Sequence, residues 1–375
     1  MKFTTTVLVF CVAALLALGT TMLYSSPAGL KFVAQQAIWL SVGLVACLAA
    51  TLFDYRRLKK ISWLIYAAAL ALLAAVLVPK VGFHVNGASR WLKFHSISFQ
   101  PSEFAKLALI IVLAHYTEHF QRQMPKFGKG LLVPGAIVAP LLALIFLEPD
   151  YGTTLLLAAV SAVMLIIAGV RLTIIAPTVL VGLLAVSVSI AHNENRMQRV
   201  TAFLHPEEHR EGKGFQQYQA TIALGSGGLT GVGLGDGRQK FGYVPENHTD
   251  FILSIVGEEL GLVATLGVVL AFLGIGFCGI YIASHACDRF GAMLACGVTF
   301  LIALQAFINI GVVTTILPNK GLPLPFVSYG GSSLLMMLTS LGVLLNVARH
   351  AHEPVRRTRS LNPFNPREIP STQLP

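Results

Sequence analysis

Charge is scarce in this sequence. Only 12% of the 375 residues are Asp, Glu, Lys or Arg, whereas 55% are hydrophobic and the mean hydropathy is +0.71. Soluble domains carry about twice as much charge, roughly a quarter of their residues. The low charge, together with repeated apolar runs of about 20 residues, excludes a soluble globular protein and indicates an all-α protein that crosses a membrane many times.

Cysteines are also few, and none is placed for a disulfide or a metal site. The five cysteines include no CxxC pair. All but Cys287 lie in apolar runs, and Cys287 lies in a short turn expected on the cytoplasmic side. We expect no disulfide, because no thiol faces an oxidising compartment.

Ten apolar runs are long enough to cross roughly 30 Å of hydrocarbon as helices. They cover residues 5–24, 33–53, 61–79, 101–118, 131–148, 151–169, 172–191, 250–284, 290–317 and 327–349. The fifth and sixth runs meet at a proline and a glycine within 148–152, and a single helix through this point would be too long for the bilayer. A tight hairpin is predicted there, which gives ten transmembrane helices in one membrane domain, residues 1–349.

The basic residues predict the orientation. Ten spans place both termini on one side, which holds 15 of the 27 Lys and Arg residues, while 11 fall on the other side and six of these belong to the long loop 192–249. Long loops orient a chain least, so the remaining bias predicts cytoplasmic termini and a large extracytoplasmic loop between spans 7 and 8. The basic, proline-rich tail 350–375 is expected to be disordered in the cytoplasm.

The formal net charge of +10 does not indicate nucleic-acid binding. The basic residues are distributed over both membrane faces and form no single patch. Positive-inside anchoring explains most of them, and the excess outside is expected to serve a phosphate-bearing substrate.

One ion pair is expected inside the membrane. Glu103 and Lys106 lie three residues apart on a predicted helix that starts after Pro101, so they share a face. A charge inside a span costs at least about 3 kcal/mol and is a functional candidate by default. An ion pair that only holds helices together explains the two charges equally well. A pair that lines a water-filled cavity would fit both the functional and the structural interpretation.

The polar loop before the eighth span ends in a carboxylate, Asp250, at the mouth of an apolar helix. Residues 196–204 have the pattern of a helix at the membrane interface, with Arg196 and Arg199 on one face. A second helical stretch is predicted at 215–224.

Seven glycines follow within residues 225–237. This run is similar to a nucleotide-binding glycine loop, but no buried strand precedes it, so we interpret it as a flexible segment or as one that approaches a ligand closely. Arg238 and Lys240 come directly after it, where they could contact phosphate.

A second irregular segment is predicted at 317–333. Pro318, Pro323 and Pro325 break any helix there, and irregular backbone at membrane depth is tolerated only against protein or a wet cavity. Lys320 would then be a fixed positive charge near the site, although snorkelling to the interface is an alternative.

Seven motifs occur together along the whole chain, and they resemble those of the SEDS family (shape, elongation, division and sporulation). They are Gly87-Ala-Ser-Arg-Trp-Leu92, Gln100-Pro-Ser-Glu-Phe-Ala-Lys106, Glu148-Pro-Asp-Tyr-Gly-Thr-Thr154, Gly214-Phe-Gln216, Pro245-Glu-Asn-His-Thr-Asp-Phe251, Gly257-Glu-Glu-Leu-Gly261 and Ser328-Tyr-Gly-Gly-Ser-Ser333. The resemblance implies a ten-span peptidoglycan glycosyltransferase that works with a class B penicillin-binding protein. The lysine in Pro318-Asn-Lys-Gly321 favours the division branch of the family over the elongation branch.

The resemblance also implies the chemistry. The 4-hydroxyl of an incoming lipid II would attack the anomeric carbon of the growing lipid-linked glycan and displace a lipid pyrophosphate. Asp250, the Asp of the family's His-Thr-Asp motif, is predicted as the catalytic base. The predicted substrate-binding residues are Arg90, Trp91, Glu103, Lys106, Arg196, Arg199, Arg238, Lys240, Glu246, His248, Lys320 and Ser332.

No organic cofactor and no dedicated metal site is expected, although Mg²⁺ or Mn²⁺ could bridge a carboxylate and the pyrophosphate. Other division proteins are expected partners, and the expected location is the bacterial inner membrane at the septum. A lipid II flippase and a noncatalytic scaffold for a transpeptidase remain as alternatives. A flippase should concentrate polar groups at mid-membrane, whereas here they gather at the outer surface, which favours the enzyme.

Overall fold

The computed structural model describes residues 1–27, 29–79, 81–85, 88–94, 97–192, 194–204, 212, 214–242, 248–319 and 321–351. Its long helices are α1 Lys2–Ser25, α2 Gly29–Leu52, α3 Arg56–Leu77, α4 Pro101–His119, α5 Val133–Leu147, α6 Tyr151–Ile167, α7 Leu172–Ala191, α10 Ile252–Ser284, α11 Arg289–Val313 and α12 Gly331–His350. They occupy the ten predicted runs, and a short π-helix, Gly128–Leu132, leads into α5. The protein is therefore a helical, multi-span membrane protein.

Eight of these helices are long and apolar enough to cross a membrane, α5 when it is counted together with its π-helix as Gly128–Leu147. The other two are α6, which has only 17 residues, and α4, which carries Glu103, Lys106 and Glu118. The number of crossings and the side of the termini stay predictions. The predicted hairpin at 148–152 is confirmed, because α5 ends at Leu147 and α6 begins at Tyr151.

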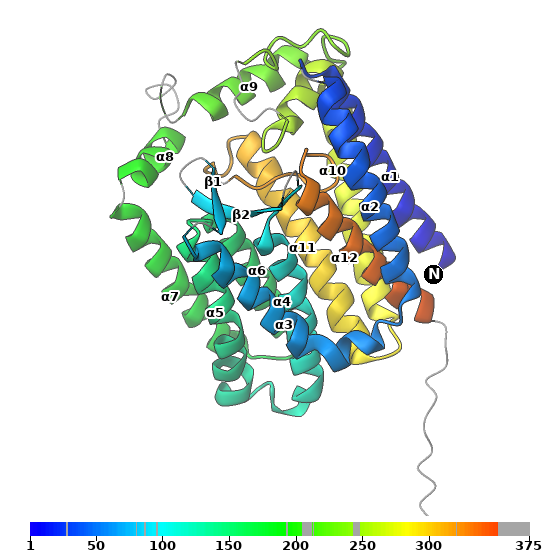
Figure 1. The fold of residues 1–375 in the computed structure, drawn as a ribbon, viewed down its shortest axis with the longest axis vertical. Coiled ribbons are helices and arrows are strands. Elements are labelled where there is room, and N and C mark those ends of the chain that lie inside the picture. Colours follow the sequence, from blue (N-terminus) through cyan, green and yellow to red (C-terminus); the bar gives the residue numbers. More distant parts are fainter. Residues whose placement is uncertain are drawn as a thin grey trace, which may run out of the picture.

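The centre of the bundle is formed by α4, α11 and α12. In the most apolar part of α12, 72% of the residues are buried, against 6% in α7, which stands at the edge of the bundle (Figure 1). Nearly every residue of α4 is buried on all sides. This central position explains how α4 keeps charged side chains, because they meet protein and not lipid.

The N-terminus and the end of α12 lie at one end of the molecule, and the loop between α7 and α10 lies at the other (Figure 1). That loop contains α8, Glu194–Leu204, and α9, Phe215–Gly227, close to the two helical stretches predicted there. The predicted tail 350–375 lies outside the described residues from position 352 onward.

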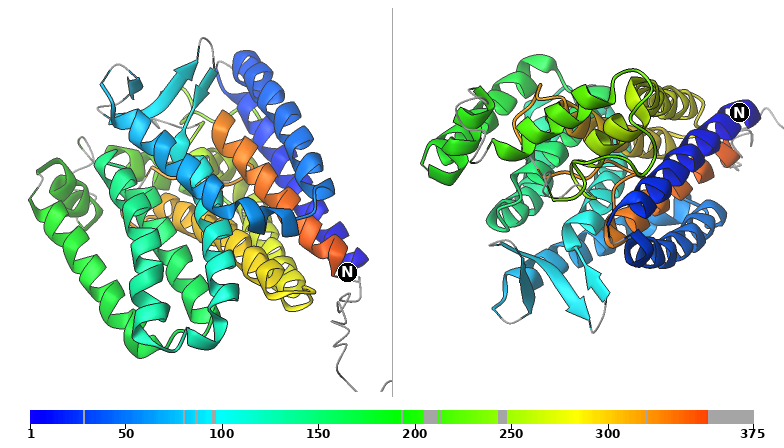
Figure 2. Two further views of the ribbon diagram at one scale, coloured as in Figure 1. Left: turned by 60° about the horizontal axis from the view of Figure 1, so that its bottom comes forward. Right: turned by 90° about the horizontal axis from the view of Figure 1, so that it is seen from above.

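A small antiparallel sheet was not predicted by the all-helical interpretation of the sequence. It consists of β1 Gly82–Val85, β2 Ala88–Phe94 and β3 Ile97–Phe99, with β2 in the middle. The sheet stands beside the helices between α3 and α4 (Figure 2). Strands this short carry little hydropathy signal, and among the strand side chains that the structure describes only that of Leu92 is buried.

Helix α10 is broken at Gly261, whose φ of 74° and ψ of −170° are not helical. The glycine-rich segment 228–233 fills the break. The N–H groups of Leu262 and Val263 donate to the carbonyls of Gly228 and Leu229 at 3.0 and 3.3 Å. The carbonyls of Glu258 and Glu259 accept in return from Val232 and Gly233 at 3.0 and 3.1 Å. The broken helix thus keeps its backbone groups paired, as the membrane interior requires.

The glycine run packs closely against this protein's own helix α10, and a close approach to a ligand stays a prediction. A Cβ atom on Gly231 would lie 2.1 Å from the Glu259 carbonyl oxygen. Gly231 also has a φ of 82°, which side chains rarely adopt. Glycine is therefore required at this position by packing and by backbone conformation together.

Candidate active site

The segment 248–250 precedes α10 and is fixed through its backbone. Each of its carbonyls accepts a hydrogen bond from a distant part of the chain: His248 from the N–H of Tyr329 at 2.9 Å, Thr249 from Ser328 Oγ at 2.6 Å, and Asp250 from Asn309 Nδ2 at 2.7 Å. The His248 ring also stacks on Phe32, with ring centroids 4.7 Å apart. Asp250 therefore lies at a defined place relative to α2, α11 and the loop before α12.

The Asp250 carboxylate lies against Gly321, because a Cβ added there would be 3.3 Å from Asp250 Oδ2. Gly321 also borders a cavity of about 150 Å³. The cavity lies between β2, the α5–α6 turn, α7, α8 and the loop after α11, and its polar lining includes Arg90, Asp150, Tyr151 and Asn319. Asp250 does not itself line the cavity, and its carboxylate meets the cavity wall at Gly321. A carboxylate next to the wall of a partly polar cavity is an arrangement that suits a general base.

Arg90 connects the sheet to the α5–α6 turn. Its Nε donates to the Glu148 carbonyl at 3.0 Å and its Nη2 to the Pro149 carbonyl at 2.6 Å. Asp150 caps α6 by accepting from the Thr153 N–H at 3.0 Å. Arg90 thus borders the cavity, as a substrate-binding residue would, while also stabilising the cavity wall.

Glu148, in the same turn, is only 1% exposed, and neither carboxylate oxygen has a hydrogen-bond partner among the described residues. Burial raises the pKa of Glu148 to about 8, and the charge of Asp150 acts in the same direction while Arg90 opposes it. At neutral pH this side chain is therefore mostly a neutral carboxylic acid.

Glu103 and Lys106 form the predicted buried ion pair, with 2.9 Å between Lys106 Nζ and Glu103 Oε1. Both are at most 3% exposed. Lys106 Nζ also donates to Gln305 Oε1 at 3.0 Å, and Gln305 Nε2 donates to the Pro323 carbonyl at 2.9 Å. Neither member of the pair borders the cavity beside Asp250. This placement favours the interpretation as an ion pair that holds helices together.

Gln305 and Asn309 were not singled out in the sequence. They lie one turn apart on α11, at 0% and 2% exposure. The signal was present, because two amides at positions i and i+4 of an apolar span obey the same rule that pointed to Glu103.

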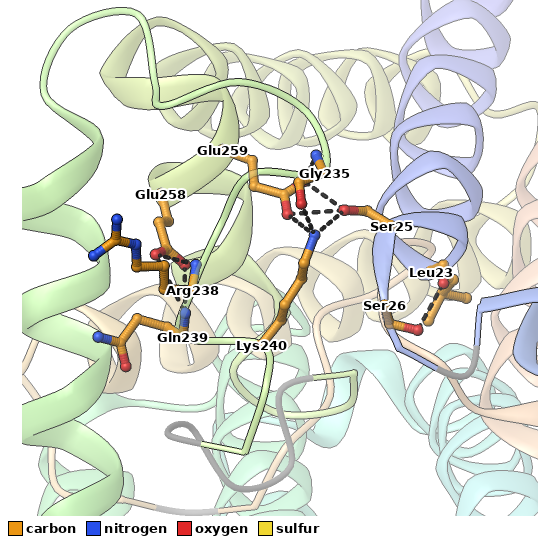
Figure 3. Close-up of polar contacts among 9 residues, drawn as sticks. All are labelled: Leu23, Ser25, Ser26, Gly235, Arg238, Gln239, Lys240, Glu258 and Glu259. Atoms are coloured by element: carbon orange, nitrogen blue, oxygen red, sulfur yellow. Dashed lines mark hydrogen bonds and ion pairs between the residues drawn. The ribbon is translucent and has the colours of Figure 1, made fainter.

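Lys240 and Glu259 form a second buried ion pair, with 2.6 Å between Nζ and Oε1 (Figure 3). Lys240 Nζ donates to Ser25 Oγ at 2.8 Å and to the Gly235 carbonyl at 2.7 Å. Ser25 Oγ donates in turn to both Glu259 oxygens. Lys240 is only 4% exposed, and its ammonium bonds to protein groups. This placement indicates that Lys240 stabilises the glycine-rich segment.

Glu258 completes this arrangement. Its Oε1 accepts from the N–H of Arg238 at 2.8 Å, and its Oε2 accepts from the N–H of Gln239 at 3.2 Å. These contacts give Glu258 a structural role. The side chain of Arg238 is exposed and points away from the pair (Figure 3). We call Ser25, Gly235, Lys240, Glu258 and Glu259 the glycine-loop clamp.

The remaining predicted residues are placed as follows. Trp91 is half-buried on β2, opposite Phe83 of β1. Ser332 is 1% exposed in the first turn of α12, and its hydroxyl has no hydrogen-bond partner among the described residues. Arg196 and Arg199 belong to α8, but their side chains are outside the description. Glu246 and Lys320 lie outside the described residues, although Asn319 and Gly321, which flank Lys320, both border the cavity.

The described residues contain no cluster of three or more acidic, His or Cys side chains that could hold a metal ion. Asp150, the carboxylate that lines the cavity, uses its oxygens to cap α6. The described side chains alone therefore do not form a ligand set for Mg²⁺ or Mn²⁺.

The fold defines a polytopic membrane protein, and the candidate site with Asp250 lies where α10 begins. Residues 3–353 match the family described as cell cycle protein, FTSW_RODA_SPOVE, and the chain belongs to this family. The resemblance inferred from the seven motifs is confirmed.

Two relatives illustrate the likeness. The probable peptidoglycan glycosyltransferase FtsW of Trichlorobacter lovleyi is 40% identical over 351 residues, which cover 91% of this chain and 92% of the relative. Stage V sporulation protein E of Bacillus subtilis is 38% identical over 353 residues, covering 92% of this chain and 96% of the relative.

Solved structures agree with the sequence relatives. A chain from a peptidoglycan synthase complex, described as coordinating polymerization and crosslinking, aligns with a TM-score of 0.79 at 29% identity and covers 92% of this chain and 98% of its own length. The rod shape determining protein RodA of Thermus thermophilus aligns with a TM-score of 0.71 at 29% identity, with coverages of 92% and 97%.

Proposed function

We propose that this protein is a peptidoglycan glycosyltransferase that polymerises lipid II at the outer face of the membrane. The observation that carries the proposal is the Asp250 carboxylate, which lies against Gly321 at the wall of a partly polar cavity. Its segment, 248–250, is held by hydrogen bonds to all three of its carbonyls. The names of the relatives and a coverage of more than nine tenths of the chain support the proposal.

In the proposed reaction Asp250 accepts the proton of the sugar 4-hydroxyl as the oxygen attacks the anomeric carbon. The new glycosidic C–O bond forms while the C–O bond to the lipid pyrophosphate breaks, and the pyrophosphate leaves with the bonding electron pair. A single displacement inverts the anomeric carbon. The leaving group needs positive charge, for which Arg90 at the cavity is the best-placed described residue and Lys320 the nearest in sequence to the cavity lining.

We further propose that any Mg²⁺ or Mn²⁺ arrives with the pyrophosphate, with Asp250 as its protein ligand, because the described side chains offer no complete site. The transfer of the proton to Asp250 does not depend on this ion. Titration of the purified protein with Mn²⁺, with and without inorganic pyrophosphate, would distinguish a resident ion from one bound through substrate.

The partner is proposed to be a class B penicillin-binding protein, since one solved relative belongs to a complex that couples polymerization to crosslinking. Relatives named FtsW and a sporulation protein support a role with other division proteins at the septal inner membrane. An elongation role of the RodA type is the alternative.

The test is polymerisation of lipid II by the purified protein together with its transpeptidase partner, in detergent and without any other glycosyltransferase. Detergent removes the second leaflet, so a flippase has no reaction to perform there. Glycan polymer is the expected product. Lipid transport across liposomes without polymer from an activated complex would instead support the flippase.

A further inference from the structure

Asn309 bridges the two segments that meet at the active site. Its Nδ2 donates to the Asp250 carbonyl and to the Leu322 carbonyl, both at 2.7 Å. Its Oδ1 has no hydrogen-bond partner among the described residues. The amide can sit only one way round, because rotating it would place Oδ1 against two carbonyl oxygens. The orientation of Asn309 is therefore set by its two donors.

Gln305, one turn away on α11, extends the same contact. It donates to the carbonyl of Pro323, the residue after Leu322, and accepts from Lys106. Consecutive carbonyls of the loop 321–324 thus depend on α11, since the proline-rich loop forms no helix of its own. Lys106 and its partner Glu103 are linked to the loop through Gln305.

We propose that Asn309 and Gln305 are positioning residues for Asp250. Asn309 fixes the position of Asp250 relative to the loop 321–324, in which Gly321 borders the cavity. Gln305 connects the same loop to the buried Glu103–Lys106 pair. The ion pair then acts on the reaction at a distance, by fixing Gln305. The proposal rests on the proposed function, in which Asp250 is the base.

The energetic reason is geometric. A base must stay within hydrogen-bond reach of the proton that it removes, and a displacement of about 1 Å can cost roughly 100-fold in rate. Losing Asn309 would release the Asp250 carbonyl and the Leu322 carbonyl together. Binding of a large lipid-linked substrate uses many other contacts and should change little, so the loss should fall on kcat.

The chain offers a matched control in Asn346. This asparagine is also fully buried, and its Nδ2 donates to the carbonyls of Ala50, Thr51 and Phe53. It lies near the far end of α12, about 21 Å along the helix from Ser332. Asn346 therefore connects two segments by amide-to-carbonyl hydrogen bonds, as Asn309 does, but it lies far from Asp250.

The experiment compares wild type, Asn309→Leu, Gln305→Leu and Asn346→Leu, each purified with the transpeptidase partner. It measures kcat and KM for lipid II and the thermal unfolding of each complex. We expect Asn309→Leu to lower kcat by about 10- to 100-fold with KM changed less than about threefold, and Gln305→Leu to lower kcat by about 3- to 10-fold. Asn346→Leu should lose as much thermal stability while its folded fraction keeps kcat within about twofold.

The outcomes separate the two hypotheses. If wild type forms no polymer, the proposed function fails. If the wild-type protein is active but the folded Asn309→Leu variant keeps the wild-type kcat, the hypothesis that Asn309 positions Asp250 is wrong. The hypothesis is also wrong if both Asn309→Leu and Asn346→Leu lose activity only because less of the protein is folded. Should Asn309→Leu not fold, the same comparison applies to Gln305→Leu.

Discussion

Two polar regions flank the start of α10, and they use their polar groups differently. In the glycine-loop clamp, Glu258 and Glu259 accept from backbone N–H groups, a hydroxyl and an ammonium. In the cavity region, Glu148 keeps two carboxylate oxygens without partners among the described residues, and the lining of the cavity includes Arg90. Paired groups hold the fold, whereas groups left with unused capacity indicate chemistry.

The sharpest test of this difference is Asp250→Asn in the cavity region. The change keeps the volume but removes the ability to accept a proton. We expect turnover to fall at least ~100-fold, and up to ~10,000-fold, because general base catalysis supplies that range. The Asp250 carbonyl still accepts from Asn309, so thermal stability should stay near wild type. Lipid II polymerisation and thermal unfolding are the measurements. A polymerisation rate close to that of the wild type would show that Asp250 is not the catalytic base.

Lys240→Met should have the opposite effect. It leaves the Glu259 carboxylate buried with only Ser25 and the Gly235 N–H as hydrogen-bond donors. Removing one partner of a buried ion pair costs about 3–5 kcal/mol of unfolding free energy. We expect a strong loss of thermal stability, with turnover per folded molecule unchanged.

The double variant Lys240→Met/Glu259→Gln provides the control, because it removes the uncompensated charge and should recover part of the stability. A loss of turnover in folded Lys240→Met, not recovered in the double variant, would show that Lys240 contacts substrate as the sequence predicted.

The contrast between these regions also shows what the sequence could predict. Hydropathy located the helices, the hairpin at 148–152 and Asp250 at the start of α10, because each depends on local composition. It could not distinguish Lys240 from Arg90, since both are basic residues in polar segments and only the fold decides which one meets a carboxylate such as Glu259. The break at Gly261 and the bridge by Asn309 depend on pairings between distant segments, which periodicity does not contain.

Gly231→Ala tests the clamp from its backbone side. The new Cβ would clash with the Glu259 carbonyl, and the φ of 82° would be strained with any side chain. We expect a loss of about 2–3 kcal/mol in unfolding free energy. Gly225→Ala is the matched control, because a Cβ there meets nothing within 4 Å. Equal thermal stability of the two variants would contradict the view that the glycine run is built to fit α10.

The last prediction concerns Glu148, and its effect is a dependence of stability on pH. Its pKa is about 8 in the folded protein and 4.5 ordinarily, so the folded state retains a proton that the unfolded chain has lost between these values. Stability from this group is therefore complete below pH 4.5 and falls as pH rises to about 8, by at most about 1.4 kcal/mol per pH unit.

Glu148→Gln mimics the neutral acid and should abolish that slope without lowering stability at pH 5. Thermal unfolding of the two proteins between pH 5 and pH 8.5 provides the measurement. If both proteins keep the same slope, Glu148 is ionised in the folded protein, and the cavity wall must then contain a counter-charge. A flat profile for Glu148→Gln alone would mean that the cavity region stores a carboxylic acid able to give up a proton near neutral pH, a capacity that the fully paired carboxylates of the clamp lack.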